Sequence, residues 1–423
     1  MSATRGTPPS PARRLSLVDQ LFLSLHWFSL NYHWGALLTI VVPAAVARQV
    51  LPAQREQVLG FITAVGALVA LVVLPLAGAL SDRSTSRLGR RRPFMIVGGI
   101  LNVCALLALA YAPTLVLLAV AFWLVELTYN IGSSAYGGLF PDMVPEAQVA
   151  SASGFMGLMT FLGIAGGGIA AGVLLSGRPL PASLSIIVLM VLTTALTVWW
   201  FREQPLLHRP PFNWREFLVG FWVDPRQHPD FAWLFLSRFL TMMGFYTLTT
   251  FLLLFLLSYL HLQNVEAKTG YVQAAVVLGG LVSAYTAARL SDRIGRRPIV
   301  SIANGIMGAV ILVFLLAPSF TLMLLLGVVF GIGFGAFTSV DWALAVEVLP
   351  SKSSAAKDLG IWGISVTLPQ VLAPGFGALL FYIVRRVGAD QGASNQGYII
   401  LFVIGAVYFF VGALTIWKIR GTR

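Results

Sequence analysis

Five ionisable side chains lie inside long apolar stretches of the sequence: Glu126, Arg238, Asp341, His26 and His33. A charge at membrane depth costs roughly 2.5–3.5 kcal/mol on insertion scales, so each such residue is a candidate functional group by default. Glu126 lies about 16 Å along an expected helix that begins near Leu115, at 1.5 Å per residue. This depth is near the middle of a bilayer, where burial disfavours the ionised carboxyl and lets it load and release a proton.

Polar positions continue from Glu126 along one face of the same expected helix. Asn130, Ser133 and Gly137 follow at spacings of four, seven and eleven residues, which places them on one side. We expect this stripe to line a cavity rather than to meet lipid, with Glu126 as a proton-coupling site. The alternative is a structural acid that is bonded to a neighbouring helix.

A second stripe lies in the first apolar stretch, where Trp27, Asn31 and Trp34 share a helical face with Leu38. Aromatic rings pack against the apolar side of a sugar ring, and amides bond its hydroxyls, so this combination suits a neutral polyol. Trp27, Asn31, Trp34 and Asn130 are therefore candidate substrate-binding residues. The alternative interpretation is that the two tryptophans are ordinary packing or interfacial residues.

Arg238 and Asp341 are expected to form a pair. Arg238 lies about 10 Å from the start of its helix near Phe231, and Asp341 about 6 Å from the end of its helix near Ala345. Because an isolated guanidinium at this depth is costly, it needs a partner. We predict that the two residues line the cavity, contribute to substrate binding and form an inner gate. The alternatives are a permanent pair, or separate solvation by cavity water.

Composition excludes most soluble enzymes. Of 423 residues, 57% are hydrophobic and only 10% are charged, against about 25% charged in ordinary soluble domains. The single Cys104 permits no internal disulfide, and the five histidines show no metal-ligand spacing. The sequence also contains no phosphate-binding G-x-x-x-x-G-K-[ST] motif and no nucleophile–base constellation at membrane depth. We therefore expect no catalytic residue, no metal and no cofactor, with a proton as coupling ion and sodium as the open alternative.

Twelve apolar runs are long enough to cross about 30 Å of hydrocarbon as helices. Helices are required because a lone segment in lipid can satisfy its backbone polar groups only internally. The sequence therefore predicts an all-α membrane protein with twelve transmembrane helices. The expected spans are 17–42, 58–80, 94–112, 115–140, 151–176, 182–201, 231–260, 268–290, 299–317, 320–345, 357–384 and 396–417.

The net charge of +12 reflects topology rather than nucleic-acid binding. With the N-terminus inside, 21 of the 28 Lys and Arg residues fall on the inner side, six on the outer side, and Arg238 within a span. A nucleic-acid interface would need these residues gathered on one folded surface with stacking aromatics. We predict an integral multi-pass protein of the cell (inner) membrane, with both termini cytoplasmic.

The chain repeats itself internally. The segment from Gly78 to Pro93 recurs as 288–298, with an offset of 206 residues between Gly89 and Gly295. A second echo relates 141–145 to 346–350 at an offset of 205. Such repeats build transporters whose site lies between the repeats near the bilayer midplane. We predict two pseudo-symmetric six-helix bundles, residues 1–201 and 231–423, joined by a cytoplasmic central loop at 202–230.

The repeated loops have the composition of a latch between rigid bodies. Gly78 allows close helix approach, Asp82 can pair with nearby Arg, and Gly89 permits a tight turn. The alternative is that the Arg run only anchors the loop in anionic headgroups. Gating candidates of the first loop and the matching end of its half are Gly78, Asp82, Arg83, Gly89, Arg90, Arg91 and Asp142; those of the second are Asp292, Arg293, Gly295, Arg296 and Glu347.

These loops, as G-x-x-x-D-R-x-G-R-R, resemble the signature loop of the major facilitator superfamily. The first loop in its expanded form, S-D-R-x-x-S-R-x-G-R-R-R-P-F over 81–94, is similar to plant sucrose/proton symporters and related animal proton-coupled sugar transporters. F-W-x-x-E-x-x-Y-N over 122–130 looks like that family's F-W-x-x-D-x-x-N-N. Glu126 and Tyr129 depart from the family's Asp and Asn, and Gly137 stands where an Arg is expected.

The resemblance implies a secondary transporter that works by alternating access, with a proton-coupled sugar or glycoside as substrate. The expected partners are the bilayer and a small molecule, probably as a monomer and without nucleic acid. One alternative is proton-coupled efflux of an amphipathic compound, and another is a non-transporting membrane chaperone or pigment-handling protein on the same fold.

Overall fold

The structure is a computed structural model of the chain, and it describes residues 14–145, 148–175, 179–203, 205–206, 223–316, 319–348, 355–387 and 393–420. Every secondary-structure element within these residues is a helix. Twelve helical stretches among them are long and apolar enough to cross a membrane. The described part of the chain is therefore the all-α, twelve-span arrangement that the apolar runs predict.

The first half contains seven α-helices that form six spans, because the first span is interrupted. A π-helical turn, η1 (Leu37–Val41), joins α1 to α2 within that span. The bounds are α1 (Leu17–Ala36), α2 (Val42–Gln49), α3 (Arg55–Ser81), α4 (Arg92–Ala110), α5 (Leu115–Met143), α6 (Val149–Leu175) and α7 (Pro179–Trp200).

The second half repeats this order with six α-helices, and its first span again contains a π-helical turn, η4 (Phe255–Tyr259). The bounds are α9 (Pro229–Leu254), α10 (Val265–Ile294), α11 (Arg296–Phe314), α12 (Phe320–Glu347), α13 (Ala355–Val387) and α14 (Ala393–Thr415). The predicted central loop falls between Trp200 and Pro229, and most of it lies outside the described residues.

Equivalent helices in the two halves begin with equivalent caps. The Thr114 hydroxyl accepts from the Leu117 amide at the start of α5, and the Ser319 hydroxyl accepts from the Leu322 amide at the start of α12. An N-cap oxygen satisfies one of the amides that a helix start leaves without an intrahelical partner. The caps lie 205 residues apart, which is the offset of the sequence repeat.

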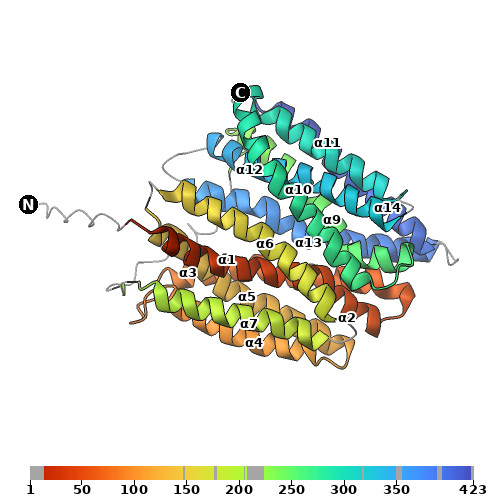
Figure 1. Ribbon diagram of the computed structural model, residues 1–423. Coiled ribbons are helices and arrows are strands. Elements are labelled where there is room, and N and C mark those ends of the chain that lie inside the picture. The colour runs from red at the N-terminus through yellow and green to blue at the C-terminus, as the bar shows by residue number, and fades with distance from the viewer. Residues whose placement is uncertain are drawn as a thin grey trace, which may run out of the picture.

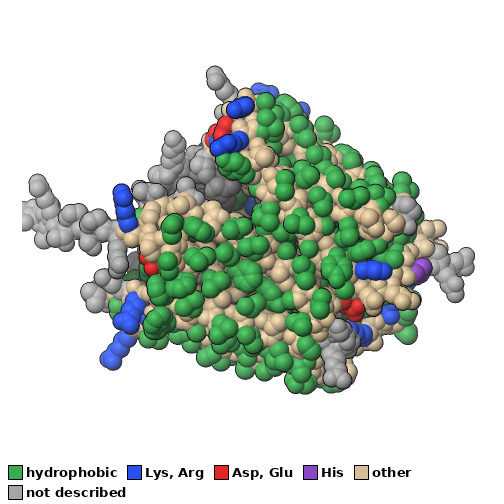
Figure 2. Space-filling model, viewed as in Figure 1, with side chains coloured by type: hydrophobic (Ala, Val, Ile, Leu, Met, Phe, Trp, Pro, Cys, Tyr) green, Lys and Arg blue, Asp and Glu red, His purple; other side chains and the backbone are tan. Residues whose placement is uncertain are grey.

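Charged side chains gather at the ends of the molecule. In the space-filling view, hydrophobic side chains cover the broad middle, while Lys, Arg, Asp and Glu appear near the margins (Figure 2). Both signature loops and both described chain ends lie at one end, which we call the basic end, and the opposite end is called the distal end. An apolar band between charged ends is what a bilayer requires.

The two halves approach each other through two helix pairs, α6 with α10 and α3 with α13. Glycines bring these pairs close: Gly172 faces the backbone of α10 at Glu266, and Gly60 faces that of α13 near Ala378. Small residues permit close helix approach in membranes, where packing rather than water drives association. In Figure 1 the halves lie together at the distal end, on the right, and diverge toward the basic end.

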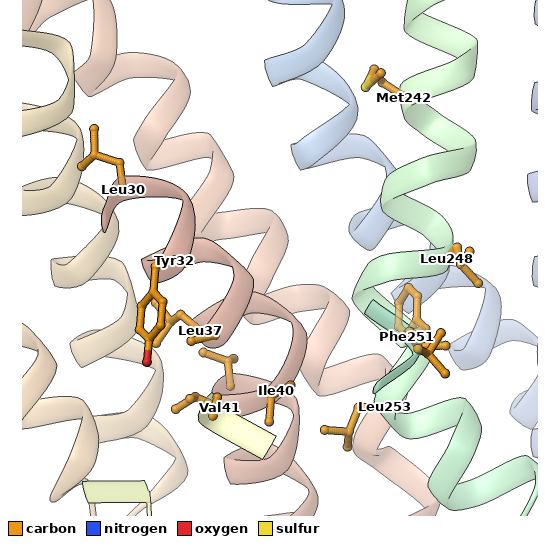
Figure 3. Packing of buried hydrophobic residues seen from close by; sticks show 14 of the residues in the cluster. Leu30, Tyr32, Leu37, Ile40, Val41, Met242, Leu248, Phe251 and Leu253 are labelled. Atoms are coloured by element: carbon orange, nitrogen blue, oxygen red, sulfur yellow. The ribbon is translucent and has the colours of Figure 1, made fainter. Parts of the chain in front are cut away.

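Apolar side chains fill the contact between the two interrupted spans. Figure 3 shows Ile40 and Val41 of η1 on one side and Leu253 of α9 on the other, with Leu253 directed toward Ile40. All three are fully buried. The π-helical turn of the first half therefore lies at the interface with the second half, close to the distal end.

Candidate functional site

Glu126 is buried in the first half between α5 and α3. Only 4% of the residue is exposed, and a Cβ at Gly66 of α3 would lie 3.1 Å from its Cγ. The Asn130 amide nitrogen donates to the Glu126 carbonyl at 2.8 Å and to its carboxylate Oε2 at 3.3 Å. The two residues that the sequence pairs on one face are therefore in direct contact.

The polar stripe of α5 is open only in part, which corrects the expectation of a continuous cavity-facing stripe. Glu126 and Asn130 are buried, whereas Ser133 is half-buried and Gly137 is exposed, with open space where its Cβ would be. The reason is that α3 and α13 close over the distal part of the stripe, while the halves separate toward the basic end.

The face of α1 that carries Trp27, Asn31 and Trp34 is half-buried. Trp27 Nε1 donates to the Thr160 hydroxyl of α6 at 2.7 Å, and the Asn31 amide donates to the Trp27 carbonyl at 2.8 Å. Trp34 packs edge-to-face on Tyr129 of α5, with 4.9 Å between ring centroids. The structure thus keeps this aromatic and amide face together and holds it in place through α6 and α5.

The two histidines of α1 lie on its other side, against α7. His26 Nδ1 is 3.2 Å from the Thr193 hydroxyl, and His33 Nδ1 is 3.0 Å from the Met190 sulfur. Both side chains are buried. They are therefore separate from the stripe of Trp27, Asn31 and Trp34, and they join helices within the first half.

Arg238 of α9 and Asp341 of α12 form the predicted ion pair, with 3.0 Å between Nη1 and Oδ2. The Asp341 side chain is 3% exposed, and its Oδ1 has no hydrogen-bond partner among the described residues. The guanidinium also lies over the ring of Trp362 from α13, 3.2 Å from its centroid. Both partners belong to the second half, so the pair joins three helices of one bundle and does not bridge the two halves.

The first signature loop folds around Arg91, which is buried. Its guanidinium pairs with Asp82 at the end of α3 and, at 3.2 Å, with Asp142 of α5, which also pairs with Arg90 at 2.8 Å. Arg91 also donates to the Ser81 hydroxyl at 2.8 Å. The cluster therefore ties the basic ends of α3, α4 and α5 to one another.

Glycines and an unexpected acid complete this loop. Gly89 has a φ of +104°, which a residue with a Cβ adopts only with strain, and Gly78 packs against the Ser134 hydroxyl of α5. Glu203, just after α7, accepts from the backbone amides of Arg91 and Arg92 at 2.8 and 3.2 Å, at the start of α4. Sequence reasoning missed Glu203 because it lies 112 residues from Arg91 outside any motif.

The second signature loop repeats only part of this arrangement. Arg296 pairs with Glu347 at 2.8 Å and donates to the Ala343 carbonyl, so it matches the pair of Arg90 with Asp142. Gly295 again has a positive φ, +93°. Asp292 and Arg293 are exposed, and within the described residues Asp292 has no ion pair that would match that of Asp82 with Arg91.

Polar contacts between the halves gather toward the distal end, and the motif analysis found none of them. Arg48 at the end of α2 pairs with Glu266 of α10 at 3.3 Å. The Tyr398 hydroxyl of α14 donates to Glu56 Oε1 of α3 at 2.7 Å, and both residues are fully buried. Gln273 of α10 donates to a carbonyl of α6 at 3.1 Å.

Within the described residues, no group of three or more His, Cys, Asp or Glu side chains could hold a metal ion. The polar groups at membrane depth are instead isolated carboxyls, amides and one guanidinium among aromatic rings. Such groups can bind a neutral polar solute through hydrogen bonds and ring stacking.

The chain matches the Major Facilitator Superfamily over residues 23–288 and again over 234–423, so it belongs to that superfamily. It is 30% identical to the general alpha-glucoside permease of Schizosaccharomyces pombe over 125 residues, which are 26% of this chain and 23% of the permease. It is 22% identical to the sucrose transport protein SUC3 of Arabidopsis thaliana over 48% of this chain and 40% of that protein. The chain thus spans less than half the length of these two relatives.

A third relative matches over nearly the full length. The multi-drug resistance efflux pump PmrA of Streptococcus pneumoniae is 22% identical over 89% of each chain. Among solved structures, the nucleoside transporter NupG superposes with a TM-score of 0.70 at 15% identity, over 95% of this chain and 98% of that one. A bacterial homolog of the human lysosomal transporter Spinster gives 0.70 at 16% identity, over 97% of each chain.

These identities to solved structures show the fold, and membership of the superfamily shows the class. The protein is an integral multi-pass membrane transporter with the twelve-helix major facilitator fold, and it is not an enzyme.

Proposed function

We propose that this transporter is a secondary active carrier that imports a sugar or glycoside together with a proton, with its basic end facing the cytoplasm. The observation that carries the proposal is Glu126, a carboxyl buried at mid-depth with the Asn130 amide as its hydrogen-bond partner. An intramembrane acid of this kind marks a proton or substrate path. The partial likeness to the alpha-glucoside permease and to the sucrose transport protein supports the substrate class.

The driving force matches this role. A proton that moves inward gains about 2.3 kcal/mol per 100 mV of membrane potential, which corresponds to several tens-fold accumulation of a co-transported solute. Glu126 would take up the proton while it is accessible from the distal side and release it toward the basic end. Sodium is the other candidate coupling ion, and the experiment below separates the two.

The contacts between the halves support alternating access. Arg48 with Glu266 and Glu56 with Tyr398 hold the distal end closed, and Gly137 of α5 lies exposed nearer the basic end. The conformation is therefore interpreted as closed outside. In the opposite conformation the distal contacts must break, and the basic ends must close around the signature loops.

In this scheme Trp27, Asn31, Trp34 and Asn130 bind the solute from the first half, and Arg238 with Asp341 from the second. The half-buried face of α1 supports the first assignment, and the hydrogen-bond capacity left on Asp341 Oδ1 supports the second. The cluster around Arg91 would act as the latch, because it fixes three helix ends as one rigid body.

The second candidate is proton-coupled efflux of an amphipathic molecule. The specific observation in its favour is the likeness to PmrA over 89% of both chains, the longest match among the relatives described. The same carboxyl would then couple proton entry to outward movement of the compound. The two candidates predict opposite directions of solute flow down the same proton gradient.

Purified protein in proteoliposomes tests the proposal. Labelled monosaccharides, disaccharides and glycosides are offered with an imposed pH gradient, with a sodium gradient, and with neither. The proposal expects accumulation of at least one sugar with the pH gradient alone, and loss of that accumulation in Glu126→Gln but not in the loop control Asp224→Asn. No uptake of any sugar, with extrusion of a hydrophobic dye on acidification of the side from which protons enter, would establish efflux instead.

A further inference from the structure

A second group of polar and aromatic side chains lies in the second half, on the same three helices that hold Arg238. The Gln370 amide nitrogen of α13 donates to the Tyr246 hydroxyl of α9 at 2.7 Å. Beside Tyr246, the rings of Phe245 and Phe334 stack with centroids 4.5 Å apart and planes 12° apart. All four side chains are half-buried, so this group, which we call the upper tier, is not sealed in the core.

The lower tier consists of Arg238, Asp341 and Trp362. On α9 and on α13 the two tiers are separated by eight residues, from Arg238 to Tyr246 and from Trp362 to Gln370. At 1.5 Å per residue this is about 12 Å along the helix axes, and the spacing of about two turns keeps each pair on one helical face. The tiers therefore lie one above the other on the same side of the bundle.

Each tier offers the same combination of chemical groups. The lower tier has a carboxylate oxygen, Asp341 Oδ1, and a guanidinium nitrogen, Arg238 Nε, that are buried without a hydrogen-bond partner among the described residues. In the upper tier the Tyr246 oxygen accepts from Gln370, which leaves the phenol proton and the amide oxygen of Gln370 available. Both tiers add aromatic surface, on which the apolar face of a sugar ring packs.

The upper tier also lies close to the depth of Glu126. A Cβ at Gly375 of α13 would lie 3.6 Å from that of Ala64 on α3, and Gly66, one turn nearer the basic end or less, contacts Glu126. Gln370 precedes Gly375 by five residues, about 8 Å toward the basic end. A ring held by the upper tier is thus at nearly the same level as the carboxyl of the first half.

We propose that the two tiers are two ring subsites, and that the transported solute is a neutral molecule with two linked rings that carry hydroxyl groups. One ring would bond Asp341 and Arg238, and the other would bond Tyr246 and Gln370 beside Glu126. A single hydroxylated ring can fill only one tier. This inference rests on the proposed function and assigns Tyr246 and Gln370 as specificity-determining residues.

The test compares ring number in proteoliposomes that contain wild-type protein, Tyr246→Phe, or the matched control Tyr271→Phe on an exposed face of α10. The probes are maltose and sucrose, with two rings, and glucose and methyl glucoside, with one. Loss of the Tyr246 hydroxyl should raise the half-saturating concentration of the two-ring probes about tenfold, the loss expected for a buried hydrogen bond. One-ring probes should change by less than about twofold, because the lower tier still binds them.

Gln370→Met serves as the second variant, since it keeps the length of the side chain and removes both amide groups. Folding is checked by size-exclusion profile and thermal unfolding of each purified variant. An equal loss for one-ring and two-ring probes, or no loss for two-ring probes, overturns the two-tier site while sugar transport stands. Absence of uptake and binding of every sugar by the wild-type protein overturns the proposed function and the inference with it.

Discussion

Removal of one hydroxyl from the distal end should change the conformation that the transporter prefers. Tyr398 of α14 donates to Glu56 of α3 at 2.7 Å, across the boundary between the halves, and Glu56 is 1% exposed. In Tyr398→Phe the carboxylate loses this donor while the distal end remains closed. When the distal end opens, water can replace the lost donor, so the substitution destabilises only the closed conformation.

The magnitude follows from the environment of the bond. A hydrogen bond to a charged group contributes about 1.5–3 kcal/mol, and 1.4 kcal/mol is a factor of ten. The closed conformation should therefore become about 10 to 150 times less populated relative to the open one. The other polar contact at this end, Arg48 with Glu266, is partly exposed and contributes about 1 kcal/mol or less, so it cannot compensate.

The assay measures access from the distal side with a membrane-impermeant maleimide. Ala64→Cys supplies the reporter, because Ala64 faces Gly375 of α13 where the halves meet, and Cys104, the natural cysteine, is replaced by serine. Tyr398→Phe should raise the labelling rate about tenfold or more. Tyr271→Phe, which removes a hydroxyl from an exposed tyrosine, should leave the rate unchanged.

A second background separates the hydrogen bond from the packing of the ring. In Glu56→Gln the acceptor is neutral, so loss of the tyrosine hydroxyl should cost only about 0.5–1.5 kcal/mol and have a smaller effect on labelling. An unchanged labelling rate in Tyr398→Phe, or the same increase in both backgrounds, would refute the assignment of this bond as a distal lock.

Three further substitutions test the site. Glu126→Gln should abolish accumulation driven by a pH gradient while exchange of substrate continues, and normal accumulation would make Glu126 structural. Asp82→Asn should lower transport by less than about tenfold without loss of membrane insertion, because Arg91 retains Asp142 and Ser81; unchanged transport would leave the loop as an anchor only. Arg238→Gln and Asp341→Asn should each impair uptake, and the exchange Arg238→Asp with Asp341→Arg should recover part of it, whereas a double exchange no better than either single change argues against a functional pair.

Local pattern was sufficient to predict the spans and several contacts. Apolar length identified the twelve helices, and the repeated loops located Asp82, Arg90 and Arg296 at the ends where their partners lie. The pair of Arg238 with Asp341 could be predicted because each residue is the rare charge at its depth. In each case the cost of an unpaired charge, or of lipid contact, restricts the possible arrangements strongly.

The contacts between the halves could not be predicted in this way. Glu56 and Tyr398 are separated by 342 residues, and each lies near the end of a span, where a polar side chain needs no partner because water is close. The burial of Glu126 likewise depends on how the halves tilt, which helical periodicity does not determine. Tyr246 and Gln370 are neutral, so no penalty for an isolated charge marks them as a pair.

The interrupted first span of each half limits how the chain can change in length. A π-helical turn holds one residue more than the α-helix around it, as at Leu37–Val41 and again at Phe255–Tyr259. Deletion of one residue from the first turn would restore a regular helix but rotate everything beyond it by about 100°. Arg48 would then point away from Glu266, so a single-residue deletion here, unlike one in a surface loop, would misalign the two repeats.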